Sequence, residues 1–304
     1  MIAPWRRPDP AAALDDVAAV AERLAALLAA GATPEAAWRY LADSEEAPSV
    51  LLAAADAAGQ ALPLAPVLVP AGDAWRRVAL LTDLAALVGA PLVDALRRSA
   101  AGLRGGAELH RAVATSVAGP AASARVTLVL PPGCAALGWA FGFDVPGALA
   151  SPVGGAALVL ALLLLTAAHR WSAALIRSAS TVDLERGVGL ELVALAVRAG
   201  RPTVTAVADA RAIAAAAGLL VDQDLADVAR LVGFAERSGA PLGALLDAEA
   251  DRARMVVLAD ARRRAAVLAT HLLLPLGGLV LPAFLLAGAL PIGLAVLSST
   301  ALSW

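Results

Sequence analysis

Charged residues are missing from three long stretches of this chain. Val126–Phe143 and Val145–Ala168 contain no Asp, Glu, Lys or Arg, and neither does the tail from Ala265 to Trp304; these stretches have 18, 24 and 40 residues. A membrane span needs roughly 20 apolar residues, and a charge at its centre costs about 2.5–3.5 kcal/mol. The pattern therefore predicts three or four membrane-spanning helices, with the charges confined to two other blocks.

The composition agrees with a membrane protein and excludes several other classes. Hydrophobic residues make up 60% of the chain and its mean hydropathy is +0.75, above the range of ordinary soluble domains. The net charge of −2 offers no generally basic surface, so no nucleic-acid partner is expected. All 24 basic residues are arginine, which excludes phosphate-loop and Schiff-base lysines. Cys134 is the single cysteine, so neither a disulfide within the chain nor a cysteine-based metal site can form.

The first charged block is predicted to form a series of short helices. Apolar residues recur at helical spacing from Leu14 to Leu28, and Gly31 ends that helix. Thr33-Pro34 begins the next one, whose apolar face carries Trp38. Prolines and glycines break up residues 42–74, which are expected to form a connector. Further helices are expected at about 75–88, from Pro91 onward, and at about 106–124, the last leading through Gly119-Pro120 to the first uncharged stretch.

The second charged block repeats the layout of the first. In both, a helix ends at a glycine, the next begins near a proline, and the block leads into uncharged sequence. The glycine supplies a left-handed C-cap and the proline starts the following helix, so each motif predicts a tight corner between helices. The corresponding motifs are Gly31 with Pro34 and Gly200 with Pro202, Gly89-Ala90-Pro91-Leu92 and Gly239-Ala240-Pro241-Leu242, and Leu130-Pro131 and Leu281-Pro282.

These patterns predict four regions: a cytoplasmic helical repeat at 1–125, a transmembrane hairpin at 126–168, a second cytoplasmic repeat at 169–264, and a C-terminal transmembrane segment at 265–304. The hairpin loop near Asp144 has no basic residue. By the positive-inside rule, both charged blocks and the N-terminus are expected in the cytoplasm. The tail is compatible with one broken helix or with a hairpin. The predicted topology anchors are Arg125, Arg170, Arg262, Arg263 and Arg264.

The sequence contains no arrangement of residues typical of catalysis, cofactor binding or metal binding, so an enzyme is not expected. His110, His169 and His271 lack a second ligand at metal-binding spacing. His271 lies in the uncharged tail, where one interpretation is a proton relay. A relay needs an ionisable partner, and the tail has no other such group. The favoured interpretation is therefore an interfacial histidine packed on a neighbouring helix.

Three further motifs are interpreted as structural. The acidic run at 222–227 lacks the glycine and glutamate of a calcium loop and is expected at a helix N-terminus, where the helix dipole favours anions. Gly187-Val188-Gly189 lacks the third glycine of a nucleotide-binding motif. Gly154-Gly155 and Gly277-Gly278 are expected to let membrane helices approach closely.

The order and duplication of these motifs resemble the type II secretion system F-domain family, and within it the platform proteins of Tad/Flp pilus systems. The resemblance covers about residues 11–300. Each motif alone is common, whereas their order, duplication and spacing from the uncharged stretches are fairly specific. The residues that carry the resemblance are Gly31 with Pro34 and Trp38, Gly89-Ala90-Pro91-Leu92 with Ala95-Leu96, Ala118-Gly119-Pro120, Leu130-Pro131, Trp171, Ser238-Gly239-Ala240-Pro241-Leu242, and Leu281-Pro282 with Pro291.

The resemblance implies an all-α, polytopic protein of the bacterial inner membrane with two repeated cytoplasmic bundles, no catalytic activity and no cofactor. Its implied role is to couple a cytoplasmic secretion ATPase to the assembly of pilin or pseudopilin subunits. Membrane lipid and a second copy or a paralogous platform protein are further implied partners. The alternatives are a small multi-pass transporter or channel subunit, for which the spans offer few polar residues, and a membrane-anchored signalling module, for which no nucleotide motif is visible.

Overall fold

Helices form all of the regular secondary structure in the part of the chain that the computed structural model describes, residues 9–43, 47–140, 145–180, 183, 185–290 and 293. No strand occurs among these residues, which confirms the all-helical class. The chain divides into two compact units. The first unit contains Met1–His110 and Val182–Asp260, and the second contains Arg111–Thr181 and Ala261–Trp304.

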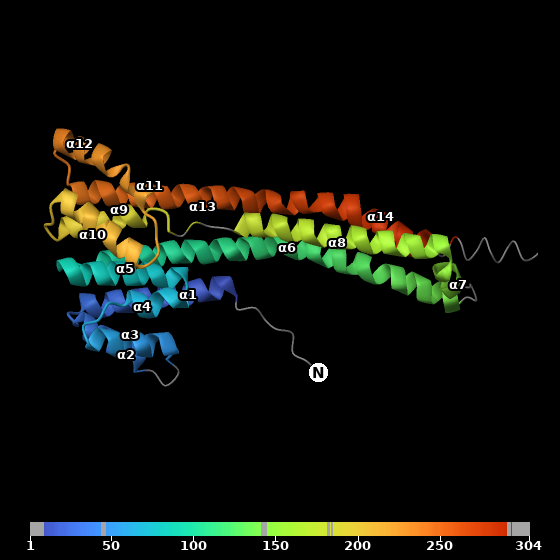
Figure 1. The fold of residues 1–304 in the computed structure, drawn as a ribbon, viewed down its shortest axis with the longest axis horizontal. Coiled ribbons are helices and arrows are strands. Elements are labelled where there is room, and N and C mark those ends of the chain that lie inside the picture. Colours follow the sequence, from blue (N-terminus) through green and yellow to red (C-terminus); the bar gives the residue numbers. More distant parts are fainter. Residues whose placement is uncertain are drawn as a thin grey trace, which may run out of the picture. The chain divides into compact units, whose positions relative to one another are not determined.

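The helices of the first unit come from both halves of the sequence (Figure 1). The first half supplies α1 (Pro10–Ala29), α2 (Pro34–Ala42), α3 (Ser49–Gly59), α4 (Ala65–Leu68), the 3-10 turn η1 (Val69–Ala71), α5 (Asp73–Val88) and the start of α6 (Val93–Ala140). The second half supplies α9 (Val188–Arg198), α10 (Thr203–Ala216), α11 (Asp222–Leu225), α12 (Val228–Ser238) and the start of α13 (Leu242–Pro275).

Glycines end the helices at the predicted corners. Gly31, Gly89, Gly200 and Gly239 have φ angles of +90°, +70°, +85° and +70°, in the left-handed region that a side chain disfavours. Pro34 opens α2, where the Thr33 hydroxyl accepts the Ala36 N–H at 3.2 Å. The other three prolines stand just before their helices rather than at the first helical position: Pro202 before Thr203, Pro241 before Leu242, and Pro91 two residues before Val93.

Helices α5 and α9 lie at the centre of the first unit. Helix α5 packs against α9, α10, α1 and α4. Leu80, Leu81 and Leu84 of α5 are almost fully buried, as are Leu192 and Leu195 of α9. Each such leucine contributes about 1.5–3 kcal/mol relative to an exposed one. One apolar core contains residues of both halves, so the two halves of the sequence stabilise each other.

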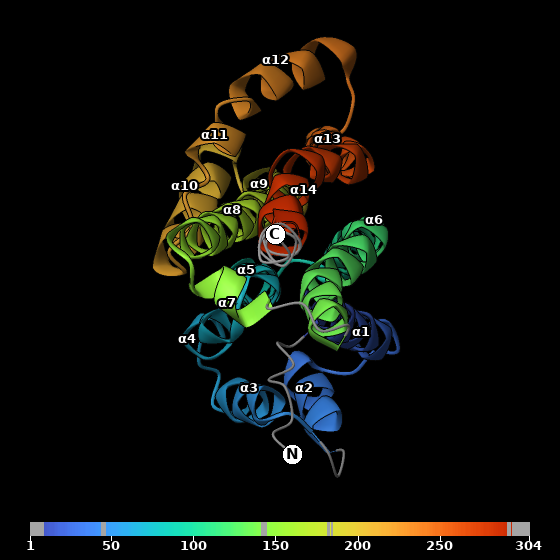
Figure 2. The same ribbon diagram turned by 90° about the vertical axis from the view of Figure 1, so that its right-hand side faces the viewer.

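Two expectations about the first charged block are wrong. Residues 42–74 are not a plain connector, because they contain α3, α4 and η1. Helix α3 forms because Leu51, Ala54 and Ala57 share one face, which is buried, and α3 lies beside α2 (Figure 2). The separate helix at 106–124 is part of α6, which continues through Gly119-Pro120 and Pro131. A long helix can contain prolines where neighbouring groups satisfy the freed carbonyls.

The second unit contains α7 (Val145–Ala150), α8 (Pro152–Ser180) and the later part of α13. The predicted span Val145–Ala168 is therefore wrong in its start, because the helix breaks at Ser151. Pro152 is the first helical residue of α8, and the Ser151 hydroxyl accepts the Gly154 N–H at 3.1 Å. A serine cap followed by proline is a strong helix start, so the sequence restarts the helix there.

The tail is helical without a hairpin as far as Leu290. After α13 come the π-helical turn η2 (Leu276–Val280), α14 (Leu281–Phe284) and a second π-helical turn η3 (Leu285–Ala289). Pro275 immediately precedes the first π turn, and Pro282 precedes the second by three residues. Proline lacks the N–H that a regular helix needs, and such interruptions are where π turns and kinks form. Pro291 lies outside the described residues.

Two helices of the described chain are long and apolar enough to cross a membrane, Pro152–Ala179 and Leu242–Ala289. In the most apolar 18-residue segment of each helix, only 22% and 28% of the segment is buried, respectively. The core helix of a soluble protein, by contrast, is mostly buried. The stretch Val126–Phe143 forms the end of α6 up to Ala140, and most of its side chains lie outside the described part. Exposed leucines such as Leu162 and Leu163 on α8 suit a lipid surface.

Small residues line the packed side of the second unit. Helix α8 packs against α14, η2 and η3, and its buried positions include Gly154, Ala157 and Ala161, while the tail buries Ala283 and Gly288. Small residues let membrane helices approach closely, as expected for Gly154. The expectation for Gly277-Gly278 is wrong, because both are exposed and nothing lies within 4 Å of a Cβ added there. They lie in the π turn η2.

Asp83 of α5 holds the start of α4. Its Oδ1 accepts the Leu64 N–H at 2.7 Å and its Oδ2 accepts the Ala65 N–H at 2.9 Å. We expect Asp83→Ala to lower the free energy of unfolding by about 1–3 kcal/mol, because two backbone donors lose their acceptor. Asp56→Ala, at an exposed position on α3, should stay within about 0.5 kcal/mol of the parent. Denaturant unfolding in detergent, followed by circular dichroism, measures both; equal effects would contradict this role of Asp83.

Candidate functional site: a buried charge cluster

Among the described residues of the first unit, Glu191 is the most buried charged one, with only 1% of its side chain exposed. It lies on α9 among the core leucines. Its Oε2 accepts hydrogen bonds from Arg77 Nη2 of α5 at 2.6 Å and from Arg254 Nη1 of α13 at 3.1 Å. Both arginines are themselves more than nine-tenths buried. One carboxylate oxygen therefore joins three helices from the two halves of the sequence.

Two more arginines and a second carboxylate extend this cluster. Arg98 of α6 places Nη2 3.1 Å from Asp247 Oδ1 of α13 and Nε 4.0 Å from Glu191 Oε1. Arg198 of α9 pairs with Asp247 from the other side. Burial lowers the pKa of Arg198 from its ordinary value, and the nearby Arg98 charge lowers it further. We call these six residues, Glu191, Arg77, Arg254, Arg98, Asp247 and Arg198, the Glu191 cluster.

The Glu191 cluster fixes geometry more than it adds stability. Removing ions from water costs several kcal/mol each, and a buried pair recovers this only when its hydrogen bonds are good. The hydrogen bonds of Glu191 with Arg77 and Arg254 are good by this measure, with N–O distances of 2.6 and 3.1 Å. By contrast, Glu191 Oε1, Arg98 Nε and Asp247 Oδ1 are buried and make no hydrogen bond. The cluster thus has a well-satisfied inner part and an incompletely satisfied outer part.

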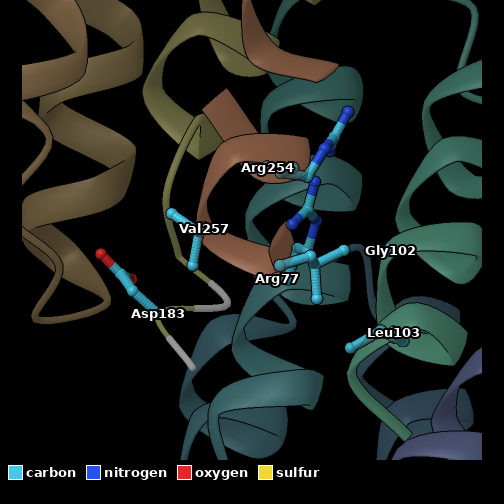
Figure 3. A pocket seen from close by; sticks show the side chains of 7 residues that line it. Arg77, Gly102, Leu103, Asp183, Arg254 and Val257 are labelled. Atoms are coloured by element: carbon cyan, nitrogen blue, oxygen red, sulfur yellow. The ribbon is translucent and has the colours of Figure 1, made fainter. Parts of the chain in front are cut away.

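A small cavity adjoins the inner part (Figure 3). Its volume is about 20 Å³, enough for one water molecule and far below the roughly 300–1,000 Å³ of a site for a small-molecule ligand. Figure 3 shows the side chains of Arg77 and Arg254 turned the same way and Asp183 turned away from them. The cavity is lined by Arg77, Gly102, Leu103, Asp183, Arg254, Val257 and Leu258. It offers no room for a cofactor.

The two glycines before Glu191 let α9 enter the core. A Cβ on Gly187 would lie 2.8 Å from the Ala250 carbonyl oxygen, and a Cβ on Gly189 would lie 2.9 Å from the Cβ atoms of Asp224 and Val221. Asp224 Oδ2 accepts the Gly189 N–H at 3.1 Å, so its carboxylate sits at the N-terminus of α9. The expected acidic helix start at 222–227 is confirmed in α11, whose first turn contains Asp222 and Asp224.

Asp224 should make stability depend on pH. Burial raises the pKa of Asp224 above its ordinary value, although the Gly189 N–H and the Arg186 charge oppose this. A raised folded-state pKa gives stability that is present below the unfolded-state value of 3.8 and is lost as pH rises through the folded-state value. Asp224→Asn should therefore gain stability relative to the parent as pH rises above 3.8. Unfolding midpoints across a pH series measure the difference, and a difference independent of pH would contradict the assignment.

None of the residues predicted to mark the site belongs to the Glu191 cluster. Trp38 is buried in the apolar core, Leu242 is half-buried at the start of α13, and the glycines and prolines shape helix ends. Arg170 and Arg262–Arg264 are exposed in the second unit. His271 is also exposed on α13, so it is not packed on a neighbouring helix as expected. Gly119, Pro120, Arg125 and Pro131 lie within α6, where their side chains are outside the described part.

The described residues contain no group of three or more His, Cys, Asp or Glu side chains that could hold a metal ion. One signal in the sequence could have identified Glu191. It is the only charged residue between Val188 and Val197, a run that is otherwise apolar or glycine. A lone acid in an apolar helix is seldom buried without a partner.

No model of a known protein family matches this chain, and neither a curated protein nor a solved structure matches it.

Proposed function

We propose that the chain is a non-catalytic, multi-pass platform protein of the bacterial inner membrane. In this proposal it belongs to a type II secretion or Tad/Flp pilus assembly machine and couples a cytoplasmic secretion ATPase to the assembly of pilin or pseudopilin subunits. The three or four spans, the cytoplasmic N-terminus and the two repeated bundles belong to the same proposal. The assignment to secretion and pilus assembly rests on the motif resemblance alone.

The observation that carries the proposal is the shared core of the first unit. Its helices come from 1–110 and 182–260, on either side of sequence assigned to the second unit. Helices α6 and α13 each begin in the first unit and end in the second. A force applied to the first unit would reach both of these helices. This is what a machine part needs if it passes a stroke from a soluble motor to membrane helices.

The order of elements supports a duplication. In the first half, α1 ends at Gly31 before α2, and α5 ends at Gly89 before α6. In the second half, α9 ends at Gly200 before α10, and α12 ends at Gly239 before α13. Each half therefore has the same sequence of corners, and each leads into apolar helix. A repeated unit of this kind favours a scaffold over a single ligand site.

A transporter or channel subunit is the alternative proposal. It would need polar or ionisable side chains along the membrane helices. The described part of Pro152–Ala179 has His169, Arg170 and Arg177 near one end, and the tail beyond Arg264 has His271 alone among ionisable residues. No continuous polar path is visible in these helices. Ion flux in reconstituted vesicles separates the two proposals, because a platform protein should give none.

Co-purification with a cytoplasmic secretion ATPase tests the platform proposal. The full-length chain in mild detergent is expected to retain the ATPase and to stimulate or slow its ATP hydrolysis. A matched sample carries Glu191→Leu, which disturbs the first unit and should reduce this association. No association in detergents that keep the chain monodisperse would contradict the proposal.

A further inference from the structure

Arg98 lies between two carboxylates and is fully engaged by neither. Its Nη2 is 3.1 Å from Asp247 Oδ1, within ion-pair distance, yet Oδ1 makes no hydrogen bond. Its Nε and Glu191 Oε1 are 4.0 Å apart, and both atoms are buried without a hydrogen-bond partner. A buried donor and a buried acceptor that face each other unsatisfied are costly. The Arg98 guanidinium therefore has a second position within reach, in which its Nε donates to Glu191 Oε1.

A small movement converts one arrangement into the other. An N–H···O hydrogen bond forms at about 2.9 Å, so an approach of about 1 Å would let Arg98 Nε donate to Glu191 Oε1. Charge-assisted hydrogen bonds of this kind are stronger than neutral ones. Arg198 already pairs with Asp247, so Asp247 would keep a partner after Arg98 leaves. Both arrangements therefore leave each carboxylate with at least one arginine.

The surface of α6 permits such a shift. One and two turns beyond Arg98, α6 presents Gly102 and Gly105 to α13. An added Cβ there would lie 3.7 Å from Arg254 Cδ and 3.1 Å from Leu258 Cδ1. Without side chains at these two positions, α6 can slide along α13 by a fraction of a turn. Sliding of packed helices by about 1–2 Å is a common switching movement.

We propose that Arg98 is a two-position ionic switch, paired with Asp247 of α13 in one position and with Glu191 of α9 in the other, and that exchange shifts α6 relative to α13. The inner contacts of Glu191 with Arg77 and Arg254 persist in both positions and hold α9 in place. That the shift transmits an ATPase stroke rests on the proposed function. The switch itself rests on the geometry of the first unit.

Pulsed electron paramagnetic resonance on the full chain in lipid nanodiscs tests the switch without any ATPase. Spin labels are placed at Arg97→Cys on α6 and Arg252→Cys on α13, whose side chains are 59% and 69% exposed, in a Cys134→Ala background. Asp247→Asn should move the mean label distance by about 1–2 Å and narrow its distribution, because Arg98 then pairs with Glu191. Glu191→Gln should keep Arg98 on Asp247, as in the structure, and leave the mean distance near that of the parent.

Two further variants keep the result decisive. Arg98→Gln removes the switch and should broaden the distribution of label distances so that it covers both positions. This variant tests the switch even if Glu191→Gln does not fold. Asp209→Asn breaks the separate pair between Arg201, which precedes α10, and Asp209 of α10, and should leave the distances unchanged. Superimposable distributions for the parent, Asp247→Asn and Arg98→Gln would overturn the proposal, as would shifts of Asp247→Asn and Glu191→Gln in the same direction. These outcomes are independent of whether an ATPase binds.

Discussion

Glu191→Leu is expected to lower the free energy of unfolding by about 3–5 kcal/mol, the typical cost of removing one partner from a buried ion pair. The variant keeps Arg77 and Arg254 buried but takes away the carboxylate oxygen that both contact. The apolar surface that the leucine buries does not offset this loss, because the guanidinium groups of Arg77 and Arg254 remain charged and buried. Chemical unfolding of the detergent-solubilised chain measures the loss.

Two comparisons separate this effect from a general loss of charge. Glu35→Gln breaks the Glu35–Arg39 pair, whose side chains are 49% and 69% exposed, and should change stability by less than about 1 kcal/mol. Glu191→Leu combined with Arg77→Met should regain part of the loss, since buried ion pairs can often be replaced by apolar residues. A Glu191→Leu variant as stable as the parent would show that the buried guanidinium groups of Arg77 and Arg254 do not need the Glu191 carboxylate.

Gly187→Ala is expected to have the second largest effect, a loss of about 2–5 kcal/mol of unfolding free energy. Gly187 has φ +81°, a conformation that costs an alanine about 1–2 kcal/mol. The added Cβ would also lie 2.8 Å from the Ala250 carbonyl oxygen, and overpacking of this kind costs about 1–3 kcal/mol more. Because the obstacle is backbone of α13, it cannot move aside as a flexible side chain can.

Gly218→Ala is the matched control for this prediction. Gly218 also has a left-handed φ, +72°, but nothing lies within 4 Å of a Cβ built there. Its substitution should cost only the conformational part, about 1–2 kcal/mol. Thermal unfolding of the two variants under one detergent condition gives the difference. Equal losses for Gly187→Ala and Gly218→Ala would mean that α9 and α13 do not approach as closely as the structure has them.

Local features of this chain were predictable from the sequence. Glycine has a strong local preference for helix ends, so the corners at Gly31, Gly89, Gly200 and Gly239 could be located without any tertiary information. The helix start at Ser151-Pro152 has the same kind of local signal, but the absence of charge over 145–168 makes that stretch resemble one continuous span. Helix α3 is harder to predict, because the prolines on both sides of it are a stronger signal than its short buried stripe.

The Glu191 cluster could not be predicted in the same way. Arg77 and Glu191 are 114 residues apart, and Arg254 and Glu191 are 63 residues apart. The chain has 24 basic and 26 acidic residues, so charge type alone does not select partners. The pairing depends on how α5, α9 and α13 pack, and the close approach of the chain before α9 to α13 depends on Gly187. Only Glu191 itself had a signal, as a single acid within an apolar helix.

Accessibility of single cysteines to a membrane-impermeant maleimide tests the central claim most directly, that both charged halves lie in the cytoplasm and that α8 lies in lipid. In a Cys134→Ala background, Arg39→Cys and Arg211→Cys probe the two halves at side chains that are 69% and 56% exposed. Leu163→Cys probes α8 at a residue that is 60% exposed. The account predicts that positions 39 and 211 react only after the cells are broken, and that position 163 reacts only after detergent is added. Reaction of either half in intact cells, or of position 163 in detergent-free buffer, would contradict it.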